Sequence, residues 1–370
     1  MDDQVIERLP EGQQKIAVKI LQGERIGTEE GISLYNEFEL PVLGMLANYV
    51  REKINSNYVY FNRNIHLEPT NICIHNCLFC SYSRKVNQEG AWEFSIEEIR
   101  EKAVEFASLD ITEIHIVGGV HPHRNVGYYS DLIATVRKQL PGVHIKAFTA
   151  AEIEHMAKKA GLSIHDALLM LKEAGLNSIP GGGAEIFDET LRKKICPDKT
   201  GSEQWLDVHR KAHELGLPSN CTILYGHMEN YDHRIDHLDR LRKLQDETDG
   251  FNAFIPLKYK SFNNSLSHIG EVSKLEDLKN YAVSRIYLDN IPHIKAYWPM
   301  TGKDLALLSL SFGVDDLDGT IMDSTKIYTM AGAEEKNPEM SVEEVTSLIK
   351  KAGRIPVERN SIYEAVQIFN

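Results

Sequence analysis

From about residue 56 onward, short apolar stretches alternate with longer segments whose apolar residues recur every three or four positions. The short stretches predict buried strands, and the longer segments predict amphipathic helices. Two helix starts carry local signals, because Ser95 and Glu98 form a capping-box pattern and Ser163 occupies an N-cap position. The predicted strands are residues 64–70, 113–117, 144–149, 177–179, 220–225, 251–257, 294–298 and 307–313, of which the last also fits a helix.

Eight strands separated by helices predict an α/β fold, a parallel (β/α)8 TIM-like barrel, with an open doubly wound sheet as the alternative. We expect an N-terminal helical layer at 1–55, the barrel at 56–320 and a C-terminal helical extension packed on it at 321–370. In such a barrel the active site lies at the carboxyl ends of the strands. Polar residues that directly follow a predicted strand are therefore the first candidates for chemistry.

The net charge and the length of the apolar runs argue against several classes of protein. The 370-residue chain carries a formal net charge of −13, which argues against broad binding to nucleic acids or anionic membranes. The acidic N-terminal residues do not resemble a signal peptide, and no apolar run approaches the roughly 18 residues of a membrane span. We expect a cytoplasmic protein.

The cysteines provide the strongest chemical signal. Cys73, Cys77 and Cys80 follow the first predicted strand with a Cys-x-x-x-Cys-x-x-Cys spacing. Thiolates suit an iron–sulfur cluster or zinc, and three of them leave one iron of a four-iron cluster open to a small molecule. His75 could complete a zinc site, although the second Cys or His pair typical of zinc sites is missing from the sequence. The remaining cysteines, 196 and 221, are expected to be small buried residues.

This spacing, with Phe79 before the last cysteine and Tyr82 two residues after it, resembles the radical S-adenosylmethionine (SAM) superfamily. The resemblance implies a [4Fe-4S] cluster held by the three cysteines, with the amine and carboxylate of SAM on the open iron. It also implies a radical SAM barrel in which Tyr82 packs on the SAM adenine. Both aromatic residues also fit an ordinary core.

The resemblance implies further SAM contacts at the strand ends. Glycines let a ligand approach the backbone closely, and an arginine pairs with the SAM carboxylate in related barrels. Each candidate also has a structural reading, as a tight turn, a helix-start glutamate or a surface charge. The candidates are Gly118, Gly119, Thr149, Glu152, Glu185 and Arg192.

Longer runs narrow the resemblance. The runs HIVGGVHP at 115–122, KAFTAAEI at 146–153 and IPGGGAEI at 179–186 are followed by LYGH at 224–227 and FIPL at 254–257. Together they resemble the aminodeoxyfutalosine synthase family, from about residue 25 to the C-terminus. Cyclic dehypoxanthinyl futalosine synthases and deazaflavin cofactor synthases share many of these runs and are the alternatives.

The resemblance implies addition of the 5′-deoxyadenosyl radical to 3-[(1-carboxyvinyl)oxy]benzoate, which leads to 6-amino-6-deoxyfutalosine in menaquinone biosynthesis. A small dicarboxylate substrate needs charge-assisted hydrogen bonds, for which Arg84, His121, His227 and Lys258 are the candidates. A one-electron reductant such as flavodoxin or ferredoxin is also implied. A homodimer is compatible with the sequence. The alternative from another functional class is an iron–sulfur electron carrier or scaffold that has no catalytic activity.

Overall fold

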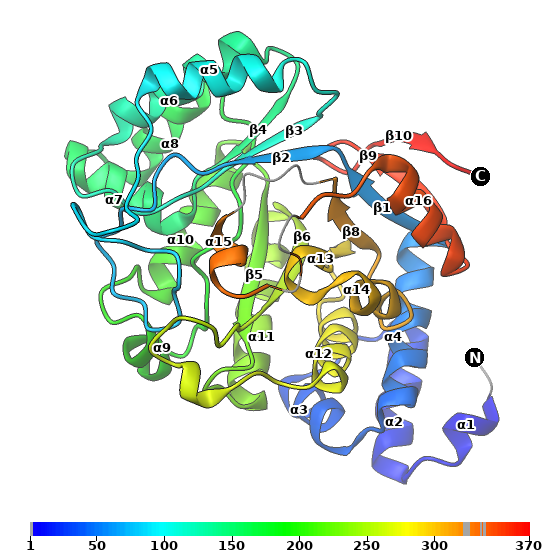
Figure 1. Ribbon diagram of the computed structural model, residues 1–370. Coiled ribbons are helices and arrows are strands. Elements are labelled where there is room, and N and C mark those ends of the chain that lie inside the picture. Colours follow the sequence, from blue (N-terminus) through cyan, green and yellow to red (C-terminus); the bar gives the residue numbers. More distant parts are fainter. Residues whose placement is uncertain (1–2, 321–325, 334, 336–337) are drawn as a thin grey trace.

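The computed structural model describes residues 3–320, 326–333, 335 and 338–370. Its first part is helical, and many apolar residues of these helices face the rest of the protein. Figure 1 shows this layer at the same side of the molecule as the C-terminal segment. The helices are α1 (Asp3–Glu7), α2 (Glu11–Gln22), α3 (Thr28–Glu37) and α4 (Leu40–Asn55).

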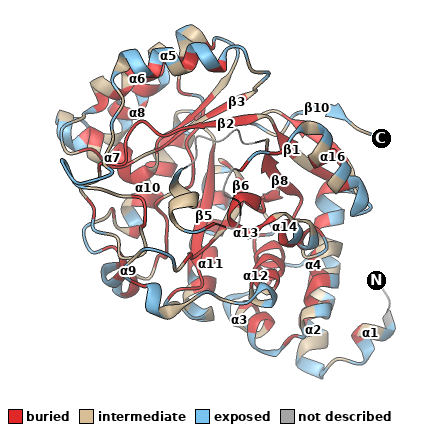
Figure 2. Ribbon diagram, viewed as in Figure 1, coloured by how far each residue is buried: buried red, intermediate tan, exposed pale blue. Residues whose placement is uncertain are grey.

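Parallel strands form the centre of the molecule, and helices surround them (Figure 1). Their interior positions are buried, as the red strands of Figure 2 show. The strands are β1 (Tyr58–Asn62), β2 (Asn64–Leu67), β3 (Glu113–Ile116), β4 (His144–Ala147), β5 (Ser219–Tyr225), β6 (Phe251–Lys258), β7 (His293–Ile294) and β8 (Asp316–Gly319).

The strands close into a barrel because β1 and β2 act as one strand with a bend between them. β1 pairs with β8, and β2 pairs with β3. The bent strand formed by β1 and β2 therefore connects β8 to β3 and closes the ring of strands. Single bridges at Ser178 and Ile179 connect β4 to β5, and a bridge from Lys295 to Asp316 connects β7 to β8. The predicted parallel barrel is therefore confirmed, and the open doubly wound sheet is wrong.

The helices begin where the sequence signals place them. The side chain of Ser95 accepts a hydrogen bond from the Glu98 amide, and Ser163 and Ser341 cap their helices in the same way. Between β2 and β7 lie α5 (Ile96–Phe106), α6 (Val126–Gln139), α7 (Ala150–Ala160), α8 (Ile164–Glu173), α9 (Glu189–Ile195), α10 (Ser202–Glu214), α11 (Tyr231–Thr248), the short 3-10 helix η1 (Ser267–Ile269) and α12 (Lys274–Tyr287). After β7 come α13 (Trp298–Thr301), α14 (Lys303–Ser309), α15 (Lys326–Met330) and α16 (Val342–Lys351). No helix among these described residues is both long and apolar enough to cross a bilayer.

The prediction of a strand at 307–313 is wrong, because α14 and a turn occupy these residues. The strand that closes the barrel is β8, whose polar sequence gives little sign of burial. Its residues Asp316 and Asp318 are buried because Arg359 and Lys295 pair with them, at 2.5 and 2.6 Å. These partners are distant in the sequence, so the local pattern could not predict them.

The segment after residue 320 is also less helical than expected. Residues 321–325 lie outside the described part of the chain. Beyond α16, strand β9 (Ile355–Arg359) runs parallel to β1, and β10 (Ala365–Ile368) pairs antiparallel with β9. This segment therefore extends the sheet around β1, while the division of the chain into three domains stays a prediction.

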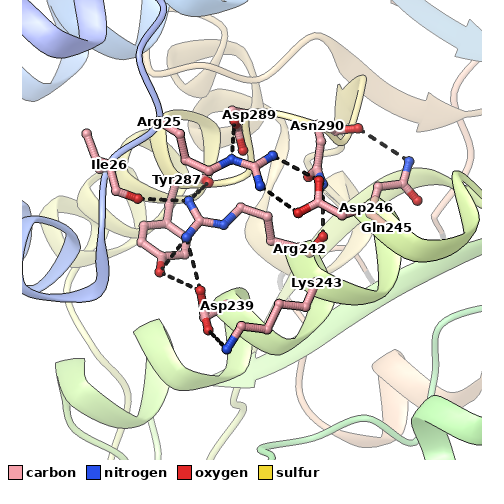
Figure 3. A network of polar contacts seen from close by, with 10 residues as sticks. All are labelled: Arg25, Ile26, Asp239, Arg242, Lys243, Gln245, Asp246, Tyr287, Asp289 and Asn290. Atoms are coloured by element: carbon pink, nitrogen blue, oxygen red, sulfur yellow. Dashed lines mark hydrogen bonds and ion pairs between the residues drawn. The ribbon is translucent and has the colours of Figure 1, made fainter.

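Two arginines attach the N-terminal layer to the barrel helices (Figure 3). Arg25, between α2 and α3, donates to Asp246 of α11 and to Asp289 just after α12, at 2.5 and 2.8 Å. Arg242 of α11 donates to the backbone oxygen of Ile26 at 3.0 Å. The layer is thus bonded to the outer surface of the barrel, away from the cysteine loop.

Candidate active site

The cysteine loop leaves the barrel at the carboxyl end of β2 and is held by its own backbone. The amide of Cys73 donates to the Arg84 oxygen, and the amide of Arg84 donates to the Asn71 oxygen, both at 2.9 Å. The ammonium group of Lys85 donates to the backbone oxygens of Cys73, Ile74 and His75, at 3.0 to 3.1 Å. These bonds fix the loop as a compact unit before any ligand binds.

The three loop cysteines are free thiols that are neither fully buried nor fully exposed. Among the described residues, no three His, Cys, Asp or Glu side chains already surround one metal position. In a four-iron cluster each cysteine binds a different iron, so the three thiols need not meet at one point. Three free cysteines on one loop beside a cavity fit the cluster, which would bind them as thiolates. The imidazole of His75, the proposed fourth ligand of the zinc alternative, lies 3.8 Å from the Asp198 carboxylate.

Cys196, which precedes the turn after α9, has an unexpected neighbour. Its thiol is a neighbour of the Cys77 thiol, and this neighbour together with burial raises the pKa of Cys77. The amide of Leu78 also donates to the Ile195 oxygen at 2.8 Å, so the two segments are joined by backbone as well. The expectation that Cys196 is buried is confirmed, and the structure adds its contact with a predicted cluster ligand.

A cavity of about 290 Å3 opens beside this loop and extends down into the barrel. Five of the eight predicted SAM contacts line it, and they come from the cysteine loop and three strand ends: Phe79, Tyr82, Gly118, Thr149 and Glu185. The Tyr82 ring meets Trp92 edge-on, with 5.3 Å between centroids, and its hydroxyl donates to the Thr70 oxygen at 3.1 Å. The ring face of Tyr82 is thereby held rigidly at the cavity wall.

Glu152 lies outside the cavity lining and hydrogen-bonds to two residues that form it, Gly118 and Thr149. Its carboxylate accepts from the amides of Gly118 and Thr149, at 3.2 and 2.8 Å, and from the Thr149 hydroxyl at 2.7 Å. Burial raises the pKa of Glu152 to about 7, although these three donors favour the ionised form. Gly119 also supports the loop, because its amide donates to the Thr70 oxygen at 2.8 Å. A SAM contact by Gly119 or by Glu152 stays a prediction.

Arg192 is buried and bonded entirely to backbone among the described residues. Its guanidinium donates to the oxygens of Gly183, Ala184, Ile186 and Thr200. It therefore shapes the glycine turn, and its contact with SAM also stays a prediction. The cavity lining near the glycine turn contains a different cation, Lys199, which was not among the residues predicted from the sequence.

Lys199 lies just after α9. Its ammonium group is 2.6 Å from Oε1 of Glu185 and 5.9 Å from the centroid of the Phe79 ring. Burial lowers the pKa of Lys199, but the negative charge of the nearby Glu185 carboxylate raises it by more, so the amine is charged. Lys199 is thus a fixed positive charge between the cysteine loop and the glycine turn.

Three of the four predicted substrate contacts lie outside the described cavity lining. Arg84 donates to the oxygens of Ser81 and Ser83, at 3.0 and 2.9 Å. His121 lies 3.3 Å from Glu93 in a separate small depression. His227 donates through Nε2 to the Leu224 oxygen at 3.0 Å, and its other nitrogen lies 3.3 Å from Glu229. Their substrate roles stay predictions, and these contacts give each of them a structural role.

Lys258 is the one substrate candidate that lines the described cavity. Its ammonium group donates to Asp277 at 2.8 Å and to the Val272 oxygen at 2.9 Å. Asp277 also accepts from the Tyr225 hydroxyl at 2.9 Å. Two of the three protons of Lys258 are therefore used, and one is left for a ligand.

Sequence reasoning also missed polar residues inside the barrel. On a strand that carries two of them, the two residues are separated by one position, so both side chains point into the barrel. Asn64 and His66 on β2 are an example. This alternation was visible in the sequence, where polar residues interrupt otherwise apolar strands. The interior residues of this kind that line the cavity are Asn64, His66, Glu113, His115, Lys146, Asn220, Thr222, Lys295 and Asp318.

Comparison with known families identifies the chemistry of this loop. Residues 67–241 match the family model for the radical SAM superfamily, and residues 248–370 match that for the CofH/MqnC C-terminal region. The aminodeoxyfutalosine synthase of Thermus thermophilus is 46% identical over 96% of this chain and 96% of its own. The chain belongs to the radical SAM superfamily. It is therefore a radical SAM enzyme that uses a [4Fe-4S] cluster and SAM, which excludes the electron-carrier alternative.

Other relatives of this radical SAM enzyme have related names. The aminodeoxyfutalosine synthase of Streptomyces coelicolor is 42% identical over 94% of this chain and 92% of its own. The cyclic dehypoxanthine futalosine synthase of the same organism is 37% identical over 95% and 88%. Among solved structures, methylornithine synthase has the same fold, with a TM-score of 0.74 at 18% identity over 92% of this chain and 97% of its own.

Proposed function

We propose that this radical SAM enzyme is an aminodeoxyfutalosine synthase. It joins the 5′-deoxyadenosyl group of SAM to 3-[(1-carboxyvinyl)oxy]benzoate, with aryl migration and loss of the carboxyl carbon as bicarbonate, to give 6-amino-6-deoxyfutalosine. The observation that carries the proposal is the 46% identity to a named synthase along nearly the whole of both chains. The hydrogen-bond donors and the apolar walls of the cavity also support it.

The hydrogen-bond donors of the cavity support a substrate with two carboxylates. Among the described residues, five lysines line the cavity, and each forms an ion pair with one carboxylate, so the lining offers ammonium N–H donors and no surplus of charge. Buried anions need such partners because their desolvation is costly. The five lysines are Lys146, Lys199, Lys258, Lys260 and Lys295.

The chain's own residues place the reactants. When bound, the reduced cluster and SAM supply a 5′-deoxyadenosyl radical. Phe79, Tyr82 and Lys199 surround the outer end of the cavity, where SAM would lie beside the cysteine loop. Leu224, Leu257 and other apolar residues line the walls below, and such walls exclude water and position the acceptor carbon. We propose a flavodoxin- or ferredoxin-type protein as the one-electron donor.

The decisive experiment is anaerobic incubation of reconstituted protein with SAM, dithionite and the vinyl ether, followed by mass analysis of the product. A synthase gives a product that contains the adenosine carbons covalently, without an equal amount of free 5′-deoxyadenosine. Free 5′-deoxyadenosine formed in step with product would contradict the proposal. It would favour hydrogen abstraction, as expected of a cyclic dehypoxanthinyl futalosine synthase.

A further inference from the structure

The inner end of the cavity, inside the barrel, has a set of polar side chains that the cysteine loop does not touch. We call Asn64, His115, Lys146, Lys295, Tyr297 and Asp318 the inner polar group. They come from β2, β3, β4, the segment after β7, and β8. Lys295 pairs with Asp318 at 2.6 Å, and Asn64 donates to Asp318 at 3.3 Å, so the members are linked.

Three atoms of the inner polar group have no hydrogen-bond partner among the described residues: Asn64 Oδ1, His115 Nε2 and the hydroxyl oxygen of Tyr297. Asn64 and Tyr297 are only 2% and 5% exposed. Buried polar atoms are almost always paired, so unpaired ones that line a cavity indicate where a ligand supplies the partner. Burial keeps both Tyr297 and His115 uncharged, since it raises the pKa of the phenol and lowers that of the imidazole. Each can therefore donate one hydrogen bond.

The two lysines add further donors. Lys146 lies 2.7 Å from Glu113 and Lys295 lies 2.6 Å from Asp318, so each ammonium group uses one proton on its carboxylate partner. The other protons remain for a ligand. Since donors outnumber free acceptors here, the complementary ligand group is one that only accepts, and an ionised carboxylate is such a group.

An apolar surface lies next to these donors. Tyr297 and Met300 pack together with Ile255, Leu257 and Tyr328 as a hydrophobic cluster separate from the main core. The rings of Tyr297 and Tyr328 are 4.6 Å apart, and all five residues line the cavity. Tyr297 belongs to both sets, because its ring is part of the apolar surface while its hydroxyl is one of the unpaired donors.

We propose that the inner end of the cavity binds an aryl carboxylate, with the ring on this hydrophobic cluster and the carboxylate held by Tyr297, His115 and Lys295. The proposal rests on the proposed function and deepens it, because it assigns the benzoate end of the substrate to the inner end. The vinyl group then points outward to the cysteine loop. The order of the two ends thereby decides which carbon of the substrate meets SAM.

Binding without turnover tests the site. We would titrate the anaerobically reconstituted holoenzyme, with SAM present, with 3-methoxybenzoate and with the uncharged 3-methoxybenzamide, observed by NMR of the ligand. Wild-type protein is expected to bind the acid at least about tenfold more tightly than the amide. Tyr297→Phe and His115→Leu should each weaken binding of the acid by roughly tenfold to a hundredfold, and binding of the amide by less.

Tyr281→Phe is the matched control, because the Tyr281 hydroxyl is also buried and unpaired among the described residues but lies outside the cavity lining. It should bind both ligands as wild type does. Iron content and circular dichroism like those of wild type would report that Tyr297→Phe is folded and holds its cluster. Equal binding of acid and amide by wild type, or unchanged binding of the acid by Tyr297→Phe, would overturn the inference.

The proposed function fails by a different observation. If wild-type protein forms no adenosyl adduct from the vinyl ether but still binds 3-methoxybenzoate through Tyr297 and His115, the synthase assignment is wrong and the aryl carboxylate site stands. If the adduct forms while the two variants bind the acid normally, the assignment stands and the inner site is wrong.

Discussion

Lys199 and Glu185 form an ion pair, 2.6 Å apart, that joins the turn after α9 to the glycine turn after residue 180. The pair lies at the outer end of the cavity, beside the Phe79 ring and close to Cys77. Both side chains are mostly shielded from water, with 14% and 10% exposed. The ammonium group of Lys199 is therefore held at a fixed position beside the ligand that binds at the cysteine loop.

We therefore expect Lys199→Met to impair SAM use. Removing one partner of a buried pair leaves an uncompensated carboxylate, which costs about 3–5 kcal/mol, and it removes a cation from the SAM side of the cavity. The affinity for SAM, measured by equilibrium dialysis on reconstituted protein, should fall at least about tenfold. Lys194→Met, an exposed lysine on α9, is the control. Unchanged SAM affinity in Lys199→Met would show that the pair only stabilises the fold.

The cluster ligands give a second prediction. Reconstituted wild-type protein should hold about four irons, and replacing Cys73, Cys77 or Cys80 by alanine should abolish SAM cleavage. Cys221→Ala, in a buried strand far from the loop in sequence, should keep both iron and activity. Cys196→Ala should also keep the cluster, although Cys196 contacts Cys77. Iron analysis and 5′-deoxyadenosine release measure these outcomes, and activity in any of the three single variants would contradict the ligand assignment.

Gly119 supports the cysteine loop from below, and its substitution is expected to disturb cluster binding. A Cβ atom at this position would lie 2.6 Å from the carbonyl carbon of Ile72, which is backbone of the loop and cannot move aside easily. Gly119→Ala should therefore lower iron content and slow SAM cleavage, while circular dichroism stays close to wild type. Gly142→Ala is the control, because no atom lies within 4 Å of a Cβ there. Full iron content in Gly119→Ala would contradict this role.

His237 predicts a pH dependence of stability. Its Nε2 donates to the Thr222 oxygen at 2.8 Å, its ring stacks on Phe187 at 3.8 Å, and burial lowers its pKa to about 3. Because the unfolded pKa is about 6.5, the stability from neutral His237 is complete above pH 6.5 and is lost as the pH falls toward 3. Between pH 7.5 and 5 this group should account for a loss of about 2 kcal/mol.

The measurement is urea denaturation of cluster-free protein at both pH values. His237→Gln keeps a donor for the Thr222 oxygen but does not titrate, so it should lose less stability than wild type on acidification. His165→Gln, at an exposed histidine, should leave the difference between the two pH values unchanged. An identical loss in wild type and His237→Gln would mean that other groups govern the acid sensitivity.

The sequence predicted what is local and missed what depends on distant partners. The cysteine spacing, the caps at Ser95 and Ser163 and most strands depend on residues close together in the chain. Strand β8 and Lys199 depend on partners elsewhere in the chain or in a neighbouring turn, namely Arg359, Lys295 and Glu185. The histidines and lysines inside the barrel were visible as polar positions within predicted strands, but only the closed barrel shows that they face one cavity.

The position of β1 between β8 and β9 has a consequence for the order in which the protein forms. Tyr60 pairs with Asp316 and with Val357, so nearly the whole chain must be synthesised before β1 has neighbours on both sides. Contacts between such distant segments form slowly, because the long loop between them must first close. On the ribosome, β1 therefore waits as an unpaired edge while the middle of the barrel assembles. A chaperone that shields this edge would be most useful late in synthesis, just before β9 emerges.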